Sequence, residues 1–204
     1  DRSPAGVVRI DPATGNRTLL SGGAAGSGQS FVSPFGLAVE PSGSILVSDS
    51  GADVLFRVNA ATGARSVVAS NTVGTGSSLF ALQGLARDTM PGFVLAADSS
   101  ARSVLRIDTA TGNRSVVSSS SVGTGPGFLF PTYLAQGSTG TIFVADPTLD
   151  AIVAVDPATG NRTVLSDDAT GAGPQFARPQ GVAFTSTGLL VPDLDLDAIV
   201  AVDF

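Results

Sequence analysis

Short apolar runs separated by turn residues follow one another along the whole chain. Runs such as ILVSD from Ile45 and IFVAD from Ile142 are apolar at successive positions, and segments rich in Gly, Pro, Asp and Ser separate them. This pattern is typical of buried β-strands joined by tight turns. No segment has the sustained apolar period of 3.6 residues that predicts a helix. We therefore predict an all-β protein.

The pattern recurs about every 48 residues. The segments RIDPATGNRTLLS, RVNAATGARSVVA, RIDTATGNRSVVS and AVDPATGNRTVLS begin at Arg9, Arg57, Arg106 and Ala154, and a truncated copy, AVDF, ends the sequence. A second shared block lies between these segments, so that each repeat has room for four strands. A fixed period of this length is typical of solenoids and propellers. Four short strands in each repeat predict the antiparallel blades of a β-propeller.

The repeat boundaries predict one propeller domain over residues 1–204. Blade repeats cover about 22–70, 71–119, 120–167 and 168–204, and residues 1–21 supply strands that complete a blade. In the first repeat we expect strands near 36–39, 45–48, 54–58 and 66–69. The strands near 36–39 and their counterparts consist of small residues, which suits the crowded axis of a propeller. The count of 17 strands leaves two alternatives open, namely a closed four-bladed ring and a larger ring that is part of a longer array or is assembled from two chains.

Residues between the strands have expected structural roles. Asp11, Asn59, Asp108 and Asp156 begin turns of the type DPATGNR, in which the side chain accepts hydrogen bonds from its own turn. We expect Phe31, Leu79, Phe128 and Phe176 to pack between blades. Arg17, Arg65, Arg114 and Arg162 begin the last strand of each repeat, where we expect charge to prevent pairing with foreign strands.

Composition excludes several functions. The chain of 204 residues has no Cys and no His, which removes thiolate metal sites and the commonest general base. The formal net charge of −6 disfavours a nucleic-acid partner. The longest apolar runs have the length of strands, so that we expect no membrane span.

The motif P-x-G-[LV]-A followed by [LI]-x-V-x-D, as in SPFGLAVEPSGSILVSD, resembles the NHL-type repeat and its relatives in gluconolactonase and strictosidine-synthase-like propellers. The resemblance covers nearly the whole chain and implies a propeller. Such propellers include sugar-lactone hydrolases, lyases and platforms that bind proteins. The metal-dependent lactonases hold Ca²⁺ with a Glu/Asn/Asp set, whereas the single Glu here, Glu40, falls in a turn away from the predicted channel.

Two rings of equivalent residues fall at the predicted mouth of the central channel. Carboxylates converging on the axis would hold a hard cation such as Ca²⁺, and the alternative is that each accepts hydrogen bonds from its own turn. The members of this first ring are Asp49, Asp98, Asp146 and Asp193. The second ring is the candidate ligand site, because its residues differ most in chemistry between repeats. Its members are Phe35, Gln83, Thr132, Tyr133 and Gln180. Arg178 also departs from the repeat and is a further candidate for ligand binding.

These observations favour a non-enzymatic binding or structural module. Its ligand, a protein or a small molecule, would bind at the channel mouth or the blade loops. For this module we expect an extracellular or periplasmic location, no obligatory cofactor and a homo-oligomer formed by blade completion. The alternative is a Ca²⁺-dependent enzyme of the lactonase or lyase kind with its site at the channel mouth.

Overall fold

The computed structural model describes residues 5–204. These residues form 17 strands and no helix, which confirms the all-β prediction. Accordingly, the described part of the chain has no helix that could cross a membrane.

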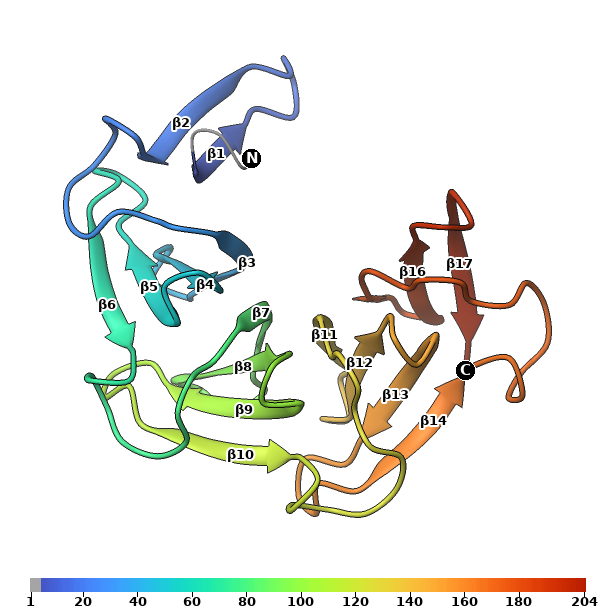
Figure 1. Cartoon of the computed structure of the whole chain (residues 1–204). Coiled ribbons are helices and arrows are strands. Elements are labelled where there is room, and N and C mark those ends of the chain that lie inside the picture. The colour runs from blue at the N-terminus through green and yellow to red at the C-terminus, as the bar shows by residue number, and fades with distance from the viewer. Residues whose placement is uncertain (1–4) are drawn as a thin grey trace.

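Each complete repeat forms one four-stranded antiparallel sheet, or blade, in chain order from the axis outward (Figure 1). The first blade has β3 (Pro34–Val39), β4 (Ile45–Asp49), β5 (Val54–Val58) and β6 (Arg65–Ala69). The second has β7 (Leu82–Arg87), β8 (Phe93–Asp98), β9 (Ser103–Asp108) and β10 (Arg114–Ser118). The third has β11 (Tyr133–Gln136), β12 (Ile142–Asp146), β13 (Ala151–Val155) and β14 (Arg162–Ser166).

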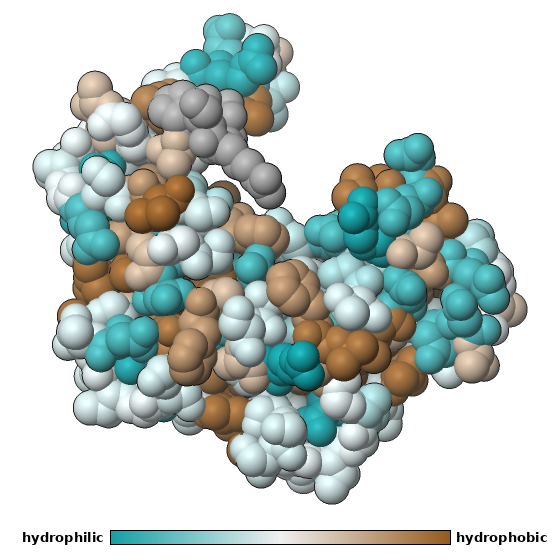
Figure 2. Space-filling model, viewed as in Figure 1, coloured by the Kyte–Doolittle hydropathy of each residue, from teal (hydrophilic) through white to brown (hydrophobic). Residues whose placement is uncertain are grey.

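Both ends of the array are partial blades. At the N-terminal end, β1 (Gly6–Ile10) and β2 (Arg17–Gly22) form a two-stranded sheet that corresponds to the third and fourth strands of a blade. At the C-terminal end, β15 (Ala183–Phe184), β16 (Gly188–Asp193) and β17 (Ala198–Asp203) correspond to the first three strands. No strand pairing joins these two sheets within residues 5–204. The blades therefore form an open arc, and the space-filling view shows an open gap between its ends (Figures 1 and 2).

The core lies between successive blades. The buried cluster around Leu46, Leu55 and Leu82 joins the first blade to the second, and a cluster containing Leu95 and Val144 joins the second to the third. At the axis, a Cβ on Gly36 would lie 2.8 Å from the Cα of Gly84, so that these first strands approach as closely as their small residues predict. We call the four residues expected to pack between blades the plugs. All four are buried in the clusters between blades, which confirms that prediction, and they are Phe31, Leu79, Phe128 and Phe176.

The arginines that begin the fourth strands form specific hydrogen bonds in addition to placing charge at the edge of the sheet. The guanidinium of Arg162 donates hydrogen bonds to Ser118 and to the carbonyl oxygens of Ser119, Val122 and Pro126, in the segment that leads into its own blade. Arg65 and Arg114 bind the corresponding segments in the same way. The role predicted for these three arginines is therefore incomplete: each fastens the connector, the segment joining the fourth strand of one blade to the first strand of the next, to the blade that follows.

Candidate binding site at the channel mouth

The ring of aspartates ties three parts of each blade together. Asp49 ends β4 and is fully buried, and its oxygens accept hydrogen bonds from the main-chain N–H groups of Val32 (2.7 Å) and Ser33 (2.8 Å) in the incoming connector. The same carboxylate accepts from Gly51 (3.1 Å) and Ala52 (3.0 Å) in the turn that follows β4. One side chain thus fixes a connector, a strand end and a turn.

The other three blades repeat this arrangement. Asp98, Asp146 and Asp193 are at most 2% exposed, and each binds the end of its connector and its own turn. The connector amides bound in this way belong to Phe80 and Ala81, Leu129 and Phe130, and Ala177 and Arg178. The sequence offered the alternative that each aspartate accepts hydrogen bonds from its own turn. The structure shows these bonds and adds a second set, from the connector.

This geometry bears on the cation hypothesis for the ring. Each carboxylate already accepts three or more main-chain hydrogen bonds, which compete for the oxygen lone pairs that a cation would need. Within the described residues, no group of three or more acidic side chains is placed to hold a metal ion. The Ca²⁺ site at Asp49, Asp98, Asp146 and Asp193 stays a prediction.

The carboxylate ring supports a rim of exposed apolar side chains. In each blade, the main-chain N–H of the residue that follows the buried plug donates to the aspartate, and the side chain of that residue is exposed. The residues at this position are Val32, Phe80, Leu129 and Ala177. Val32 is 63% exposed, Phe80 58% and Leu129 39%, and the next residue of the third blade, Phe130, is 42% exposed. We name Val32, Phe80, Leu129 and Phe130 the mouth rim. The sequence analysis did not predict the mouth rim. A signal was present, because a second apolar residue follows the buried plug in the pairs FV, LF and FL.

The predicted ligand residues lie nearer the axis and separate into two groups. The rings of Phe35 and Tyr133 come from the first and third blades and meet with their centroids 5.1 Å apart. Burial raises the pKa of the Tyr133 hydroxyl. Gln83 and Thr132 are buried beside them, where the Gln83 amide group donates to Ser99. The first three blades thus bring Phe35, Gln83, Thr132 and Tyr133 together.

Gln180 and Arg178 lie apart, on the C-terminal blade. Gln180 lines a cavity of about 380 Å³ with Asp193, Leu194 and Ile199. The guanidinium of Arg178 forms an exposed ion pair with Asp195 at 2.7 Å. An anion at Arg178 would have to compete with this carboxylate.

Two further acids on this face carry raised pKa values. Burial raises the pKa of the Asp53 carboxyl, and the charges of Asp98 and Asp49 add to the effect. Burial likewise raises the pKa of Asp150, together with Asp168 and other nearby acids. Both residues lie after the second strand of a blade and adopt positive φ. At both positions the charges that act on the carboxyl belong to other aspartates.

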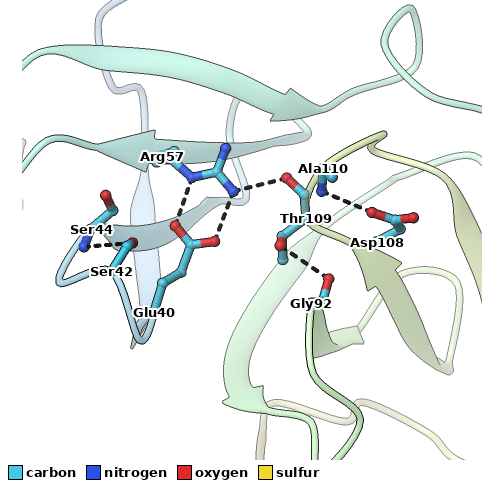
Figure 3. A network of polar contacts seen from close by, with 8 residues as sticks. All are labelled: Glu40, Ser42, Ser44, Arg57, Gly92, Asp108, Thr109 and Ala110. Carbon is cyan, nitrogen blue, oxygen red and sulfur yellow. Dashed lines mark hydrogen bonds and ion pairs between the residues drawn. The ribbon is translucent and has the colours of Figure 1, made fainter.

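The opposite face holds a smaller cleft between the first two blades. Val39, Met90 and Phe93 line its volume of about 230 Å³, together with Glu40 and Asp88. Beside it, Arg57 joins Glu40 to the carbonyl oxygen of Thr109 (Figure 3). Glu40 thus lies in the turn where the sequence predicts it, away from the channel mouth.

Comparison with known proteins finds similarity of structure alone. No family model matches the sequence, and no curated protein matches it. A Bacteroides thetaiotaomicron protein of unknown function superposes with a TM-score of 0.72 at 14% identity, covering 92% of this chain and 50% of that protein. A catalytically inactive virginiamycin B lyase from Staphylococcus aureus, solved with quinupristin, superposes with a TM-score of 0.62 at 13% identity, covering 81% of this chain and 50% of the lyase.

A chain from a nidogen/laminin complex gives a TM-score of 0.62 at 14% identity, covering 96% of this chain and 84% of that one. The present chain spans about half the length of the lyase and of the Bacteroides protein. At these identities the likeness concerns the fold, and it supports the resemblance to NHL-like propellers at that level. The chain is a β-propeller.

Proposed function

We propose that this propeller is a binding module whose mouth rim docks a protein partner. The observation that carries the proposal is the exposure of Val32, Phe80, Leu129 and Phe130 on connectors held by buried carboxylates. The three connectors present these side chains at equivalent positions, and exposed apolar surface is a feature that protein interaction sites use. Because hydrogen bonds preorganise the connectors, a partner would lose little entropy on ordering them.

The chemistry of the rim indicates the kind of partner. Its side chains offer aromatic and aliphatic surface, whereas Asp53 and Asp150 make the same face acidic. A segment with apolar side chains flanked by Lys or Arg would complement both features. We expect such a module in an extracellular or periplasmic setting. Among the fold neighbours, the nidogen/laminin structure is itself a protein complex.

A peptide selection tests the proposal. Phage-displayed peptides are selected on the whole chain and then assayed on the variant Phe80→Ser/Phe130→Ser and on the matched control Met90→Ser. Met90 is 45% exposed but lies on the opposite face. The proposal expects basic, apolar peptides that lose binding to the rim variant and keep it to the control. Peptides that bind the rim variant and the intact chain equally would refute it.

The alternative function is a Ca²⁺-dependent enzyme of the lactonase or lyase kind. The fold likeness to virginiamycin B lyase supports it, and the hydrogen bonds to the aspartate ring weigh against it. The inactive lyase variant has alanine in place of a histidine, and the present chain has no histidine. Thermal unfolding with and without millimolar Ca²⁺, together with hydrolysis of a simple sugar lactone, distinguishes the two functions. A Ca²⁺-dependent rise in Tm that Asp98→Asn abolishes would favour the enzyme.

A further inference from the structure

The second blade departs from its neighbours in the turn between its first two strands. The N–H of Asp88 donates to the carbonyl oxygen of Phe93 and closes this turn over six residues, 88–93. The first and third blades close the same turn over five residues, 40–44 and 137–141. The longer turn brings Phe93 to a position that is polar in both of these blades.

This turn forms one wall of the cleft between the first two blades. Val39 and Leu46 of the first blade belong to the facing wall, and the lining as a whole is mostly apolar. The cleft has a volume of about 230 Å³. Pockets for drug-sized ligands have roughly 300 to 1,000 Å³, so that this cleft suits a smaller molecule with a single ring or a short chain.

Hydrogen bonds from other strands hold the turn in place. The N–H and the hydroxyl group of Thr109 both donate to the carbonyl oxygen of Gly92, at 2.9 and 3.0 Å (Figure 3). From the other side, the side-chain oxygen of Gln136 in the third blade accepts a bond of 2.6 Å from the N–H of Thr89. The cleft is therefore preformed, and a ligand would lose little free energy in ordering its walls.

The charges around the cleft leave one group without an opposite charge. Glu40 accepts two hydrogen bonds from Arg57, at 2.6 and 2.7 Å, and the buried Asp88 forms an ion pair with Arg106. Arg87 also lines the cleft but is exposed and forms no ion pair within residues 5–204. The first and third blades have uncharged residues at this position. The cleft thus combines apolar walls with one guanidinium that is free to bind an anion.

We propose that this cleft binds a small apolar acid, with its ring or chain against Val39 and Phe93 and its carboxylate on Arg87. A planar guanidinium donates two parallel hydrogen bonds to a carboxylate, and burial of the apolar part adds affinity. An amine of the same size would meet the charge of Arg87, while both nearby carboxylates are already paired. The site lies on the face opposite the mouth rim and is independent of the partner proposed there.

Three ligands with the same phenyl group test the proposal, namely hydrocinnamate, its neutral amide and phenylpropylamine. Each is titrated into the ¹⁵N-labelled whole chain, and amide chemical shifts report both the affinity and the place of binding. We expect saturable shifts over 38–41 and 87–94. The acid should bind more tightly than the amide, and the amide more tightly than the amine.

Substitution of Arg87 distinguishes the charge from the apolar walls. Arg87→Gln should weaken the binding of hydrocinnamate by about five- to tenfold, to the level of the neutral amide. Arg87→Glu should reverse the order in favour of the amine. The matched control is Arg102→Gln, because Arg102 is exposed in the turn between β8 and β9 of the same blade, far along the chain from the cleft, and it forms no ion pair among the described residues.

Three results would overturn the proposal. The first is the absence of saturable shifts over 87–94 at millimolar hydrocinnamate. The second is an amine that binds as tightly as the acid, and the third is an equal loss of affinity in Arg87→Gln and Arg102→Gln. Unchanged amide shifts outside the cleft show that a variant is folded. Failure of the mouth rim to bind peptides would leave each of these results unaffected.

Discussion

Arg57 donates two hydrogen bonds to Glu40, at 2.6 and 2.7 Å, and a third to the carbonyl oxygen of Thr109 in the next blade. Arg106 and Asp88 form the same kind of ion pair in the second blade. In the third and C-terminal blades, Ala154 and Ala201 replace the arginine. There Phe143 and Phe184 stack with centroids 6.1 Å apart. The face opposite the mouth therefore changes from ionic to aromatic contacts along the arc.

Arg57→Ala should destabilise the chain through the loss of this ionic link. The Arg57 side chain is 33% exposed, so that we expect a loss of about 1 kcal/mol, at the upper end for ion pairs that solvent screens. Urea unfolding measures the difference. Arg87→Ala is the control, because Arg87 is exposed and forms no ion pair among the described residues. Equal midpoints for the two variants would show that the link to Glu40 and Thr109 adds nothing to stability.

Asp146→Ala should be far more damaging than Asp108→Ala. Asp146 is fully buried, and its loss leaves the N–H groups of Leu129 and Phe130 without acceptors, which should cost about 3 kcal/mol or more. Asp108 accepts two main-chain bonds in an exposed turn, where water can replace it. Denaturant midpoints compare the two variants. A small loss for Asp146→Ala would contradict the role of the aspartates in holding the connectors.

Asp53→Asn should stabilise the chain at neutral pH and have little effect in acid. The folded state raises the pKa of Asp53, so that ionisation opposes folding. The stability associated with the protonated carboxyl is complete below the unfolded pKa and is lost as pH rises through the folded pKa. Asn removes the charge and tolerates the positive φ of this position.

Thermal unfolding from pH 3 to 7 checks this expectation. The Tm of Asp53→Asn should rise above that of the unmodified chain as pH increases, and Asp150→Asn should behave alike. Asp108→Asn is the control, because main-chain hydrogen bonds from Ala110 and Thr111 lower the pKa of Asp108, and the first blade has Asn59 at this position. A constant Tm difference across the pH range would be evidence against the charge effect.

Gly74→Ala and Gly43→Ala separate backbone strain from crowding. Both glycines have positive φ, 77° and 85°, so that alanine costs about 1 kcal/mol or more at either position. Gly43 has nothing within 4 Å of an added Cβ, whereas Gly74 faces the carbonyl of Gly112. We expect Gly74→Ala to lower the free energy of unfolding well beyond Gly43→Ala. Similar losses would mean that the connector can move away at little cost.

The sequence predicts features that arise within one repeat. The period, the strands and the turns at Asp11, Asn59, Asp108 and Asp156 follow from local patterns, and the side chains of all four accept hydrogen bonds from their own turns. The positions of the aspartate ring are predicted too. Its bonds to the connectors are not, because Val32 lies 17 residues before Asp49 and donates through its main chain, so that no side-chain pattern marks the contact.

Contacts between segments that are well separated in sequence account for the rest. The sequence of the fourth strand does not reveal that Arg65 binds a connector, because the connector carbonyls that it binds lie more than 35 residues earlier in the chain. The exposure of Phe80 next to buried Leu79 depends on the side from which the connector enters the blade. In the structure β2 pairs with β1, and β17 has the same sequence character as β1. Both are third strands by sequence, so that the pattern alone does not distinguish them.

The hydrogen bonds that hold the mouth rim come from the main chain, which has a consequence for how the surface can change. Val, Phe, Leu and Ala occupy the same position in successive blades while the bond to the aspartate persists. Substitutions at this position leave the donor and the acceptor unaltered. The fold therefore separates the residues that maintain its shape from the side chains that the proposed binding function would use, and these side chains can differ from blade to blade while the hydrogen bonds persist.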